Sequence, residues 1–233
     1  MKKLSLILPF ALVLLTLILV LTKCKKDDSE SDLPEGFVYV ADVVPNLSLD
    51  VRYYGIDNFV GKRINGYINP VTISTVEAAT ALKKVQEELA VDNYRLKIFD
   101  GYRPQRGVDH FIEWSQIYED TLTKSKYYPN IPKSDLFDLN YLAKRSGHSR
   151  GSTYDLTIID AAGNELDMGT TWDYFGPTSW PTDTTISQLA QDNRNLLRGL
   201  MLKHGFIPYT EEWWHFTLDN EPYPETYFDF LNE

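Results

Sequence analysis

Residues 146–159 read SGHSRGSTYDLTII, a glycine- and serine-rich stretch with one histidine that runs into an apolar, β-branched segment. This pattern predicts a loop that enters a buried strand over Thr153–Ile159. A second histidine ends the stretch Glu211-Glu-Trp-Trp-His215. We expect Phe206–Tyr209 and Trp213–Leu218 to form a final antiparallel pair of strands, which would carry this second histidine.

The rest of the chain mixes strands and helices without a regular βαβ alternation. Segments typical of strands are Phe37–Val44, Leu47–Tyr54 and Tyr94–Phe99, and segments with helical spacing are residues 74–90, Gly107–Tyr118 and Ile186–His204. The mixture predicts an α+β fold in which helices flank a small antiparallel sheet. Ser74 and Glu77 have the spacing of a capping box. In the last helix, Ile186–His204, the spacing of the apolar residues predicts that five of them face the core: Leu189, Leu196, Leu197, Leu200 and Met201.

The composition excludes several classes of protein. The 233 residues are 43% hydrophobic and 24% charged, which is typical of a globular domain. Lys and Arg number 23 against 33 Asp and Glu, so the formal charge is −10. A chain this acidic is a poor partner for nucleic acid, because phosphate binding requires clusters of Lys and Arg. The single cysteine excludes an internal disulfide framework and any multi-cysteine metal site.

The N-terminus has the features of an export signal. Lys2 and Lys3 precede an apolar run from Leu4 to Leu21. Cys24 follows the run in a sequence that resembles a bacterial lipobox, so this cysteine is a candidate for lipidation, although Lys23 stands where a small residue is usual. The run is also long enough to cross a bilayer, so an uncleaved membrane anchor is the alternative.

The sequence therefore predicts three parts. Residues 1–23 would be the signal segment and residues 24–36 a flexible acidic tether, because so charged a segment buries too little apolar surface to fold. Residues 37–233 would be the folded domain. Either interpretation of the N-terminus places this domain outside the cytoplasm, attached to a membrane only through its N-terminal lipid or anchor.

The two histidine stretches have the residues of a catalytic zinc site. Such a site takes three protein ligands from His, Asp or Glu and keeps a fourth position open. His148, Asp155 and His215 would suffice, and the spacing of the first two suits a loop that enters a strand better than one helical face. Glu212 is placed to take a proton from an attacking water. Arg103, in the turn DGYRP, is a candidate cation for the oxyanion that attack on an amide creates.

These stretches resemble the D-alanyl-D-alanine dipeptidase family, the VanX type of zinc peptidases, whose fold is shared more distantly by D,D-carboxypeptidases and the hedgehog signalling domain. The family pattern Ser-x-His-x-x-Gly-x-Ala-x-Asp matches Ser146, His148, Gly151 and Asp155, with Thr153 where alanine is usual. The pattern Glu-x-x-His matches Glu212 and His215. Further matches are Asp50–Tyr53, Asn58–Gly61, Asp100–Pro104, Asp167–Gly169, Trp172–Phe175, Asn193–Leu197 and Gly205–Phe206, so the resemblance covers nearly all of residues 37–230.

The resemblance implies catalytic roles for the matched residues. His148, Asp155 and His215 would bind one zinc ion per chain. Glu212 would act as the general base and then as the acid that protonates the leaving amine. Arg103 would stabilise the oxyanion.

Three further residues would hold the substrate, a small dipeptide, by the same resemblance. Ser146 and Asp173 match the residues that hold the free ammonium of the substrate. A buried ammonium needs a carboxylate partner, so such a site rejects capped peptides. Tyr53 matches a pocket tyrosine, and a core aromatic residue is an equally good interpretation.

Four interpretations of the chain remain open. The leading one is a zinc dipeptidase that cleaves D-Ala-D-Ala, or a related dipeptide with a free amino group, in cell-wall peptide turnover. The alternative is a D,D- or L,D-carboxypeptidase that trims peptidoglycan stems, and Asp173 argues against it because a long stem has no free ammonium at that point. A zinc-containing binding protein without catalysis is disfavoured by Glu212 and Arg103. A purely structural lipoprotein leaves both histidine stretches unexplained.

Overall fold

The computed structural model describes residues 33–233, and the predictions for the signal segment, for Cys24 and for most of the tether lie outside them. The strands are β1 (Phe37–Tyr39), β2 (Ser48–Leu49), β3 (Ile73–Thr75), β4 (Arg95–Asp100), β5 (Thr153–Ile159), β6 (Phe206–Pro208) and β7 (His215–Leu218). The helices are α1 (Val40–Val43), α2 (Val76–Val91), α3 (Gln105–Ser115), α4 (Lys124–Tyr127) and α5 (Gln188–Lys203), with 3-10 turns at Arg52–Tyr54, Lys133–Asp135, Gly147–Arg150 and Pro177–Ser179. No helix in this part of the chain is both long and apolar enough to cross a bilayer.

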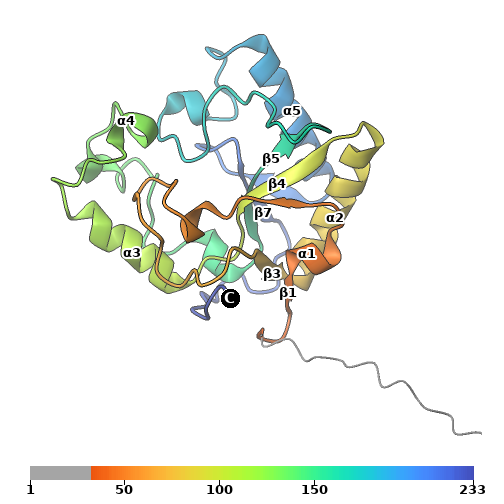
Figure 1. The fold of residues 1–233 in the computed structure, drawn as a ribbon, viewed down its shortest axis with the longest axis horizontal. Coiled ribbons are helices and arrows are strands. Elements are labelled where there is room, and N and C mark those ends of the chain that lie inside the picture. The colour runs from red at the N-terminus through yellow and green to blue at the C-terminus, as the bar shows by residue number, and fades with distance from the viewer. Residues whose placement is uncertain (1–32) are drawn as a thin grey trace, which may run out of the picture. The chain divides into compact units, whose positions relative to one another are not determined.

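A five-stranded sheet with the order β2-β4-β5-β7-β6 runs through the middle of the domain (Figure 1). Its neighbours pair antiparallel except β2 and β4, which are parallel. The α+β prediction is confirmed, with the difference that the sheet is mixed. The parallel pair is possible because the chain between these two strands includes β3 and α2, which is long enough for a crossover connection. β1 and β3 form a separate antiparallel pair.

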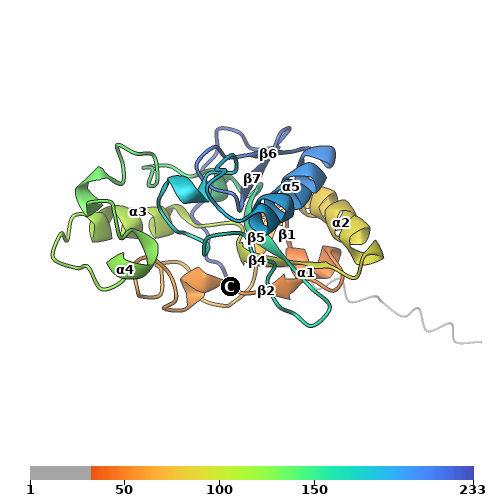
Figure 2. The ribbon, with the colours of Figure 1, turned by 90° about the horizontal axis from the view of Figure 1, so that it is seen from above.

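The central strand β5 is the most constrained element. It has the bounds that its apolar, β-branched sequence predicts, and all seven of its residues are buried. The helices α2 and α5 lie side by side against the sheet (Figure 2) and bury Leu82, Val85, Leu197 and Met201. Burial of one such side chain contributes about 1.5–3 kcal/mol. A side chain on β5 therefore has a fixed position and direction.

Two strand predictions are wrong in part. β1 ends at Tyr39, and the helical turn α1 follows, in which Val40 is fully buried. In the predicted strand Leu47–Tyr54, only Ser48-Leu49 pairs with β4. The chain then turns at Arg52–Tyr54 and directs Tyr53 into the core, where it is 1% exposed. This turn is what brings Tyr53 to the site described below.

The helices α2 and α5 are present as predicted, but the cap of α2 and the buried face of α5 differ from the prediction. Thr75, and not Ser74, caps α2 by accepting a hydrogen bond from the Ala78 N–H at 3.3 Å. The Ser74 hydroxyl is occupied instead by the Tyr154 hydroxyl, which donates to it at 2.6 Å.

In α5 the buried stripe is displaced from the predicted one. It consists of Ala190, Arg194, Leu197 and Met201, whereas the predicted inward residues Leu189 and Leu196 are 62% and 39% exposed. The cause is Arg194, a buried cation that the hydrophobic period cannot reveal. Its guanidinium donates to the carbonyls of Met168, Thr178 and Trp180.

The C-terminal tail joins two loops that matter for the site. The Phe228 N–H donates to the Ser149 carbonyl at 2.9 Å, and the Phe228 carbonyl accepts from the Gln105 N–H at 3.0 Å. The Phe228 and Phe230 rings pack edge-on against Phe37 at 4.9 and 5.0 Å. The tail thereby connects the 3-10 turn Gly147–Arg150 to the start of α3.

Candidate active site

The strand register brings two of the predicted site residues together. Asp155 on β5 lies opposite His215 on β7 and, on its other side, opposite Asp100 on β4. Residues opposite one another on neighbouring strands point to the same face of a sheet. The three side chains therefore form a row across β4, β5 and β7.

His148 reaches this row from the 3-10 turn Gly147–Arg150. The turn ends at Gly151, whose φ is +86°, and a Cβ at this position would lie 2.3 Å from the Phe37 ring. Only glycine fits there. The Gly101 carbonyl lies 2.8 Å from His148 Nδ1 and accepts the proton of that nitrogen. The lone pair of Nε2 is then free to bind a metal ion.

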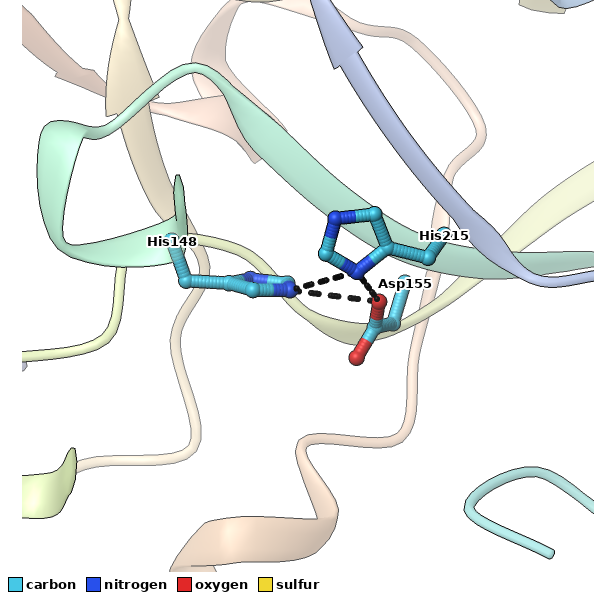
Figure 3. A group of neighbouring side chains, drawn as sticks. All are labelled: His148, Asp155 and His215. Atoms are coloured by element: carbon cyan, nitrogen blue, oxygen red, sulfur yellow. Dashed lines mark hydrogen bonds and ion pairs between the residues drawn. The ribbon is translucent and has the colours of Figure 1, made fainter. Parts of the chain in front are cut away.

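Three potential ligand atoms converge in Figure 3: His148 Nε2, Asp155 Oδ1 and His215 Nδ1. Asp155 Oδ1 lies 3.2 Å from the first nitrogen and 3.1 Å from the second, and the two nitrogens are 3.3 Å apart. Ligand bonds of about 2.0–2.2 Å at tetrahedral angles place ligand atoms about 3.3 Å apart. The spacing of the three atoms therefore suits a tetrahedral zinc ion.

The chemistry of the donor set also fits zinc. Asp155 Oδ1 is buried and has no hydrogen-bond donor among the described residues, which is rare for a carboxylate oxygen and points to a cation. Its other oxygen accepts from the Trp172 indole N–H at 3.3 Å, which orients the carboxylate. Two imidazoles and one carboxylate are a usual protein ligand set for catalytic zinc.

The metal-free site carries a proton in place of the cation. Burial by itself lowers the pKa of His215, but the neighbouring carboxylates of Asp155 and Glu212 outweigh burial and raise this pKa to about 9. Burial by itself raises the pKa of Asp155, but the two histidines hold it well below its usual range. At neutral pH a metal ion therefore displaces a proton from His215.

Arg103 lies beside the three ligands and is held in place by Asp100. Its Nε and Nη2 both donate to Asp100 Oδ2 at 2.9 Å, and Nη2 is 3.8 Å from Asp155 Oδ2. The other Asp100 oxygen accepts from the Tyr67 hydroxyl at 2.6 Å. The guanidinium also lies over the ring of Tyr53, 4.8 Å from its centroid. Arg103 is thus a fixed cation whose remaining N–H groups are free to donate.

Asp173 and Tyr53 form a second buried pair. The Tyr53 hydroxyl donates to Asp173 Oδ2 at 2.8 Å, and Asp173 is only 4% exposed. Burial, together with the nearby charges of Asp155 and Glu212, raises the pKa of Asp173 well above its usual range. Asp173 also has a φ of +57°, a left-handed conformation that few side chains adopt. A strained, buried carboxyl group of this kind is suited to a cationic ligand.

One cavity of about 220 Å³ connects these groups. Its lining includes every site residue that the sequence predicts within the domain: Tyr53, Arg103, Ser146, His148, Asp155, Asp173, Glu212 and His215. Glu212 Oε2 lies 3.4 Å from His215 Nδ1, and the Ser146 hydroxyl accepts from the His148 N–H at 3.3 Å. The cavity is smaller than a usual drug-sized pocket of roughly 300–1,000 Å³, which favours a small substrate. The individual roles of its residues stay predictions.

Sequence reasoning missed three residues at the site. Asp100 orients Arg103, Arg145 lines the cavity, and the Tyr209 ring lies 5.3 Å from the His215 ring. Asp100 and Arg145 are close in sequence to Arg103 and Ser146, so their proximity was a usable signal. Tyr209 also had a signal, because the predicted pairing of Phe206–Tyr209 with the strand of His215 brings the two residues together, and the Tyr209 N–H donates to the His215 carbonyl at 3.0 Å.

The fold and this site together define a class: a metallopeptidase with a His-Asp-His zinc site, a neighbouring glutamate and a buried arginine. The sequence model of the peptidase M15 family, described as D-Ala-D-Ala dipeptidase, matches residues 34–233. The chain belongs to this family of zinc metallopeptidases.

Curated relatives match nearly the whole domain. The D-alanyl-D-alanine dipeptidase of Streptomyces coelicolor is 43% identical over 195 residues, which are 83% of this chain and 96% of the relative. The D-alanyl-D-alanine dipeptidase of Enterococcus faecalis is 41% identical over 85% of this chain and 98% of the relative. That of Escherichia coli is 32% identical over 81% of this chain and 86% of the relative. The predicted family is therefore confirmed.

Proposed function

We propose that this protein hydrolyses D-Ala-D-Ala, or a related dipeptide with a free amino group, with one zinc ion per chain and in the turnover of cell-wall peptides. The observation that carries the proposal is the convergence of His148, Asp155 and His215 inside a small cavity that also contains the buried carboxyl group of Asp173. Membership of the D-Ala-D-Ala dipeptidase family supports the same substrate.

The protein residues around the metal site have the positions that amide hydrolysis needs. Zinc, when bound, supplies a Lewis acid that lowers the pKa of water. Glu212 accepts a proton from the attacking water and later returns it to the leaving amine. Arg103 donates N–H groups to the oxyanion that forms from the scissile carbonyl. Because Asp100 already holds the guanidinium, little reorganisation is needed in the transition state.

The free amino group of the substrate is selected by two other residues of the cavity, Asp173 and Ser146. The raised pKa of Asp173 shows that its ionised form is destabilised, so a positively charged partner stabilises that form. The Ser146 hydroxyl in the same cavity adds a neutral acceptor. A buried carboxylate is costly without a cation, so binding an ammonium relieves this cost. An N-acetylated dipeptide leaves Asp173 without that partner.

Release of alanine by the full-length, zinc-loaded chain tests this function. We expect hydrolysis of D-Ala-D-Ala and, because a site built for one polar group rejects an analogue that lacks it by about 10⁴-fold, almost none of N-acetyl-D-Ala-D-Ala. Glu212→Gln is the matched control, since it keeps the size of the side chain and removes the base. Cleavage of both peptides at similar rates would indicate a carboxypeptidase, and zinc binding without cleavage of either would leave a binding protein.

The location of the enzyme is a separate part of the proposal. The two lysines, the apolar run and Cys24 in residues 1–24 support export and attachment to a membrane. An external enzyme would act on wall fragments rather than on a cytoplasmic precursor. Mass spectrometry of the mature N-terminus distinguishes a lipid on Cys24 from an uncleaved anchor, and recovery of the unmodified chain in the cytosol would contradict both.

A further inference from the structure

A free dipeptide brings two charges into the cavity, and the inference here, which rests on the proposed function, concerns the second of them. Asp173 is placed for the ammonium group. The carboxylate at the other end of the substrate needs a cation of its own, because a desolvated carboxylate without a partner is costly. Within residues 33–233, two arginines are among the residues that line the cavity, Arg103 and Arg145.

Arg103 has few donors to offer a carboxylate. Its Nε and Nη2 are committed to Asp100 at 2.9 Å, and Nη2 also lies near Asp155. A guanidinium that binds a carboxylate at full strength uses two parallel N–H groups in a fork. Arg103 has already committed the two N–H groups of one edge to a single oxygen of Asp100, and what remains is needed for the oxyanion.

Arg145 has its full set of donors. The part of the chain that the structure describes provides it with no hydrogen bond and no ion pair. Its guanidinium lies 4.9 Å from the centroid of the Tyr227 ring, which orients it by a cation–π contact. The Tyr227 ring centroid is also 5.8 Å from the guanidinium of Arg150, whose Nε donates to both oxygens of Glu221 at 2.9 Å.

The backbone on each side of Arg145 is also fixed. The Gln105 side chain donates to the Lys144 carbonyl at 3.1 Å, and it donates as well to Asp109 at 3.0 Å. Ser146, the next residue, caps the turn that carries His148. Arg145 is an exposed residue of the cavity lining, so its N–H groups, which have no partner within residues 33–233, are open to a ligand. The backbone around it and the contact with Tyr227 limit where the guanidinium can lie.

We propose that Arg145 binds the C-terminal carboxylate of the substrate through two parallel N–H···O bonds and is the residue that restricts the enzyme to peptides ending at that position. The cavity then pairs both charges of the dipeptide, the ammonium with Asp173 and the carboxylate with Arg145. A C-terminal amide, or a peptide extended at its C-terminus, loses the pair with Arg145.

The test compares D-Ala-D-Ala with its C-terminal amide in wild type and variants. In the wild type we expect kcat/KM for the free acid to exceed that for the amide by about 10- to 100-fold, the loss that follows removal of one charged hydrogen-bond partner. Arg145→Gln should lose the same factor on the acid, mainly through KM, and nothing on the amide. Arg145→Lys should recover part of the loss, because it keeps the charge but not the fork. Lys144→Gln, a neighbouring exposed cation outside the cavity lining, should leave both substrates unchanged.

Binding to the zinc-loaded Glu212→Gln variant, measured by calorimetry, tests the same inference without turnover. The acid should bind about 10-fold or more tightly than the amide, and adding Arg145→Gln should abolish the difference. Equal binding of acid and amide, or an equal loss on both when Arg145 is replaced, would overturn the role of Arg145 while leaving the proposed hydrolysis intact. Failure of the wild type to cleave D-Ala-D-Ala while the acid still binds better would overturn the function and keep the site.

Discussion

The cavity has two walls that are built in different ways. The sheet wall consists of Arg103, Asp155 and His215, which come from strands or strand ends, and the loop wall consists of Arg145, Ser146 and Asp173, which come from irregular segments. On the sheet wall the ladder of β4, β5 and β7 fixes the backbone of Asp155 and His215, and Arg103 follows three residues after the end of β4. On the loop wall single hydrogen bonds and a left-handed residue do so.

This difference separates chemistry from selectivity. A metal site tolerates displacements of only a few tenths of an ångström in its ligands, and two of the three, Asp155 and His215, lie on constrained strands. The third, His148, lies on a 3-10 turn and is fixed there by the Gly101 carbonyl. Groups that bind the two ends of a peptide tolerate more, and loops can vary without disturbing the core. We therefore expect changes to the metal ligands of the sheet wall to remove metal and activity together, and changes on the loop wall to alter the choice of substrate while zinc stays bound.

The largest effect is expected for Asp155→Asn on the sheet wall. The substitution keeps the shape and removes the charge that faces both histidines. Zinc affinity should fall by more than the roughly 10- to 100-fold that follows loss of a partner outside the ligand shell, and activity should fall with it. Zinc content after dialysis, measured by mass spectrometry together with alanine release, provides the readout.

Asp173→Asn on the loop wall is the matched comparison. It should retain zinc at the wild-type level and lose discrimination against N-acetyl-D-Ala-D-Ala. Because burial raises the pKa of Asp173, its ionisation costs stability as the pH rises above the value of an unfolded aspartate, so the metal-free asparagine variant should melt at a higher temperature at pH 7. Loss of zinc from this variant would show that the two walls are not independent.

The sheet wall was predictable from the sequence and the loop wall only in part. Strand β5 and the pair β6–β7 have strong local signals, and their pairing alone carries Asp155 to His215. The resemblance to a family supplied Ser146 and Asp173 as residues, but no pattern reveals that Asp173 is left-handed or that Tyr53 donates to it. The Tyr53 contact depends on the turn Arg52–Tyr54, where the sequence predicts a strand.

Buried polar residues are the second reason for error. Periodicity treats Arg194 as outward-facing and Ser74 as a helix cap, yet one satisfies three loop carbonyls and the other accepts from Tyr154. The role of Asp100 was missed for the same reason. Nothing in the local sequence marks a carboxylate as buried except a nearby partner, here Arg103. Long-range hydrogen bonds decide such positions, and they are absent from any local pattern.

A smaller effect is expected in the pH dependence of zinc binding. The pKa of His215 is raised from 6.5 to about 9 in the metal-free protein. The ion pair with Asp155 and Glu212 therefore stabilises the metal-free fold fully below about pH 6.5, and this stability is lost as the pH rises through about 9. Between these values zinc must displace one proton, so its affinity should rise about tenfold for each pH unit. Calorimetry in buffers of different ionisation enthalpy should count about one proton released at pH 7.5, and a count of zero would contradict this account.

The smallest effect concerns a hydrogen bond between Tyr209, beside His215 of the sheet wall, and Asn140, in the segment that precedes Arg145 of the loop wall. The Tyr209 hydroxyl donates to the Asn140 carbonyl at 3.1 Å, and both residues line the cavity. Tyr209→Phe removes this bond and keeps the ring beside His215. A hydrogen bond of this kind contributes about 0.5–1.5 kcal/mol, so KM for D-Ala-D-Ala should rise by about 2- to 10-fold, with kcat and zinc content unchanged.

The control for Tyr209→Phe is Tyr118→Phe, which removes the hydroxyl of a tyrosine that is 56% exposed and outside the cavity lining. If the loop wall is held to the sheet wall through Tyr209, cleavage by proteases near residue 140 should increase in Tyr209→Phe and not in the control. A fall in kcat without a change in KM would mean that Tyr209 acts on the metal side through His215. In that case the tyrosine would belong to the sheet wall, and selectivity and chemistry would share at least one residue.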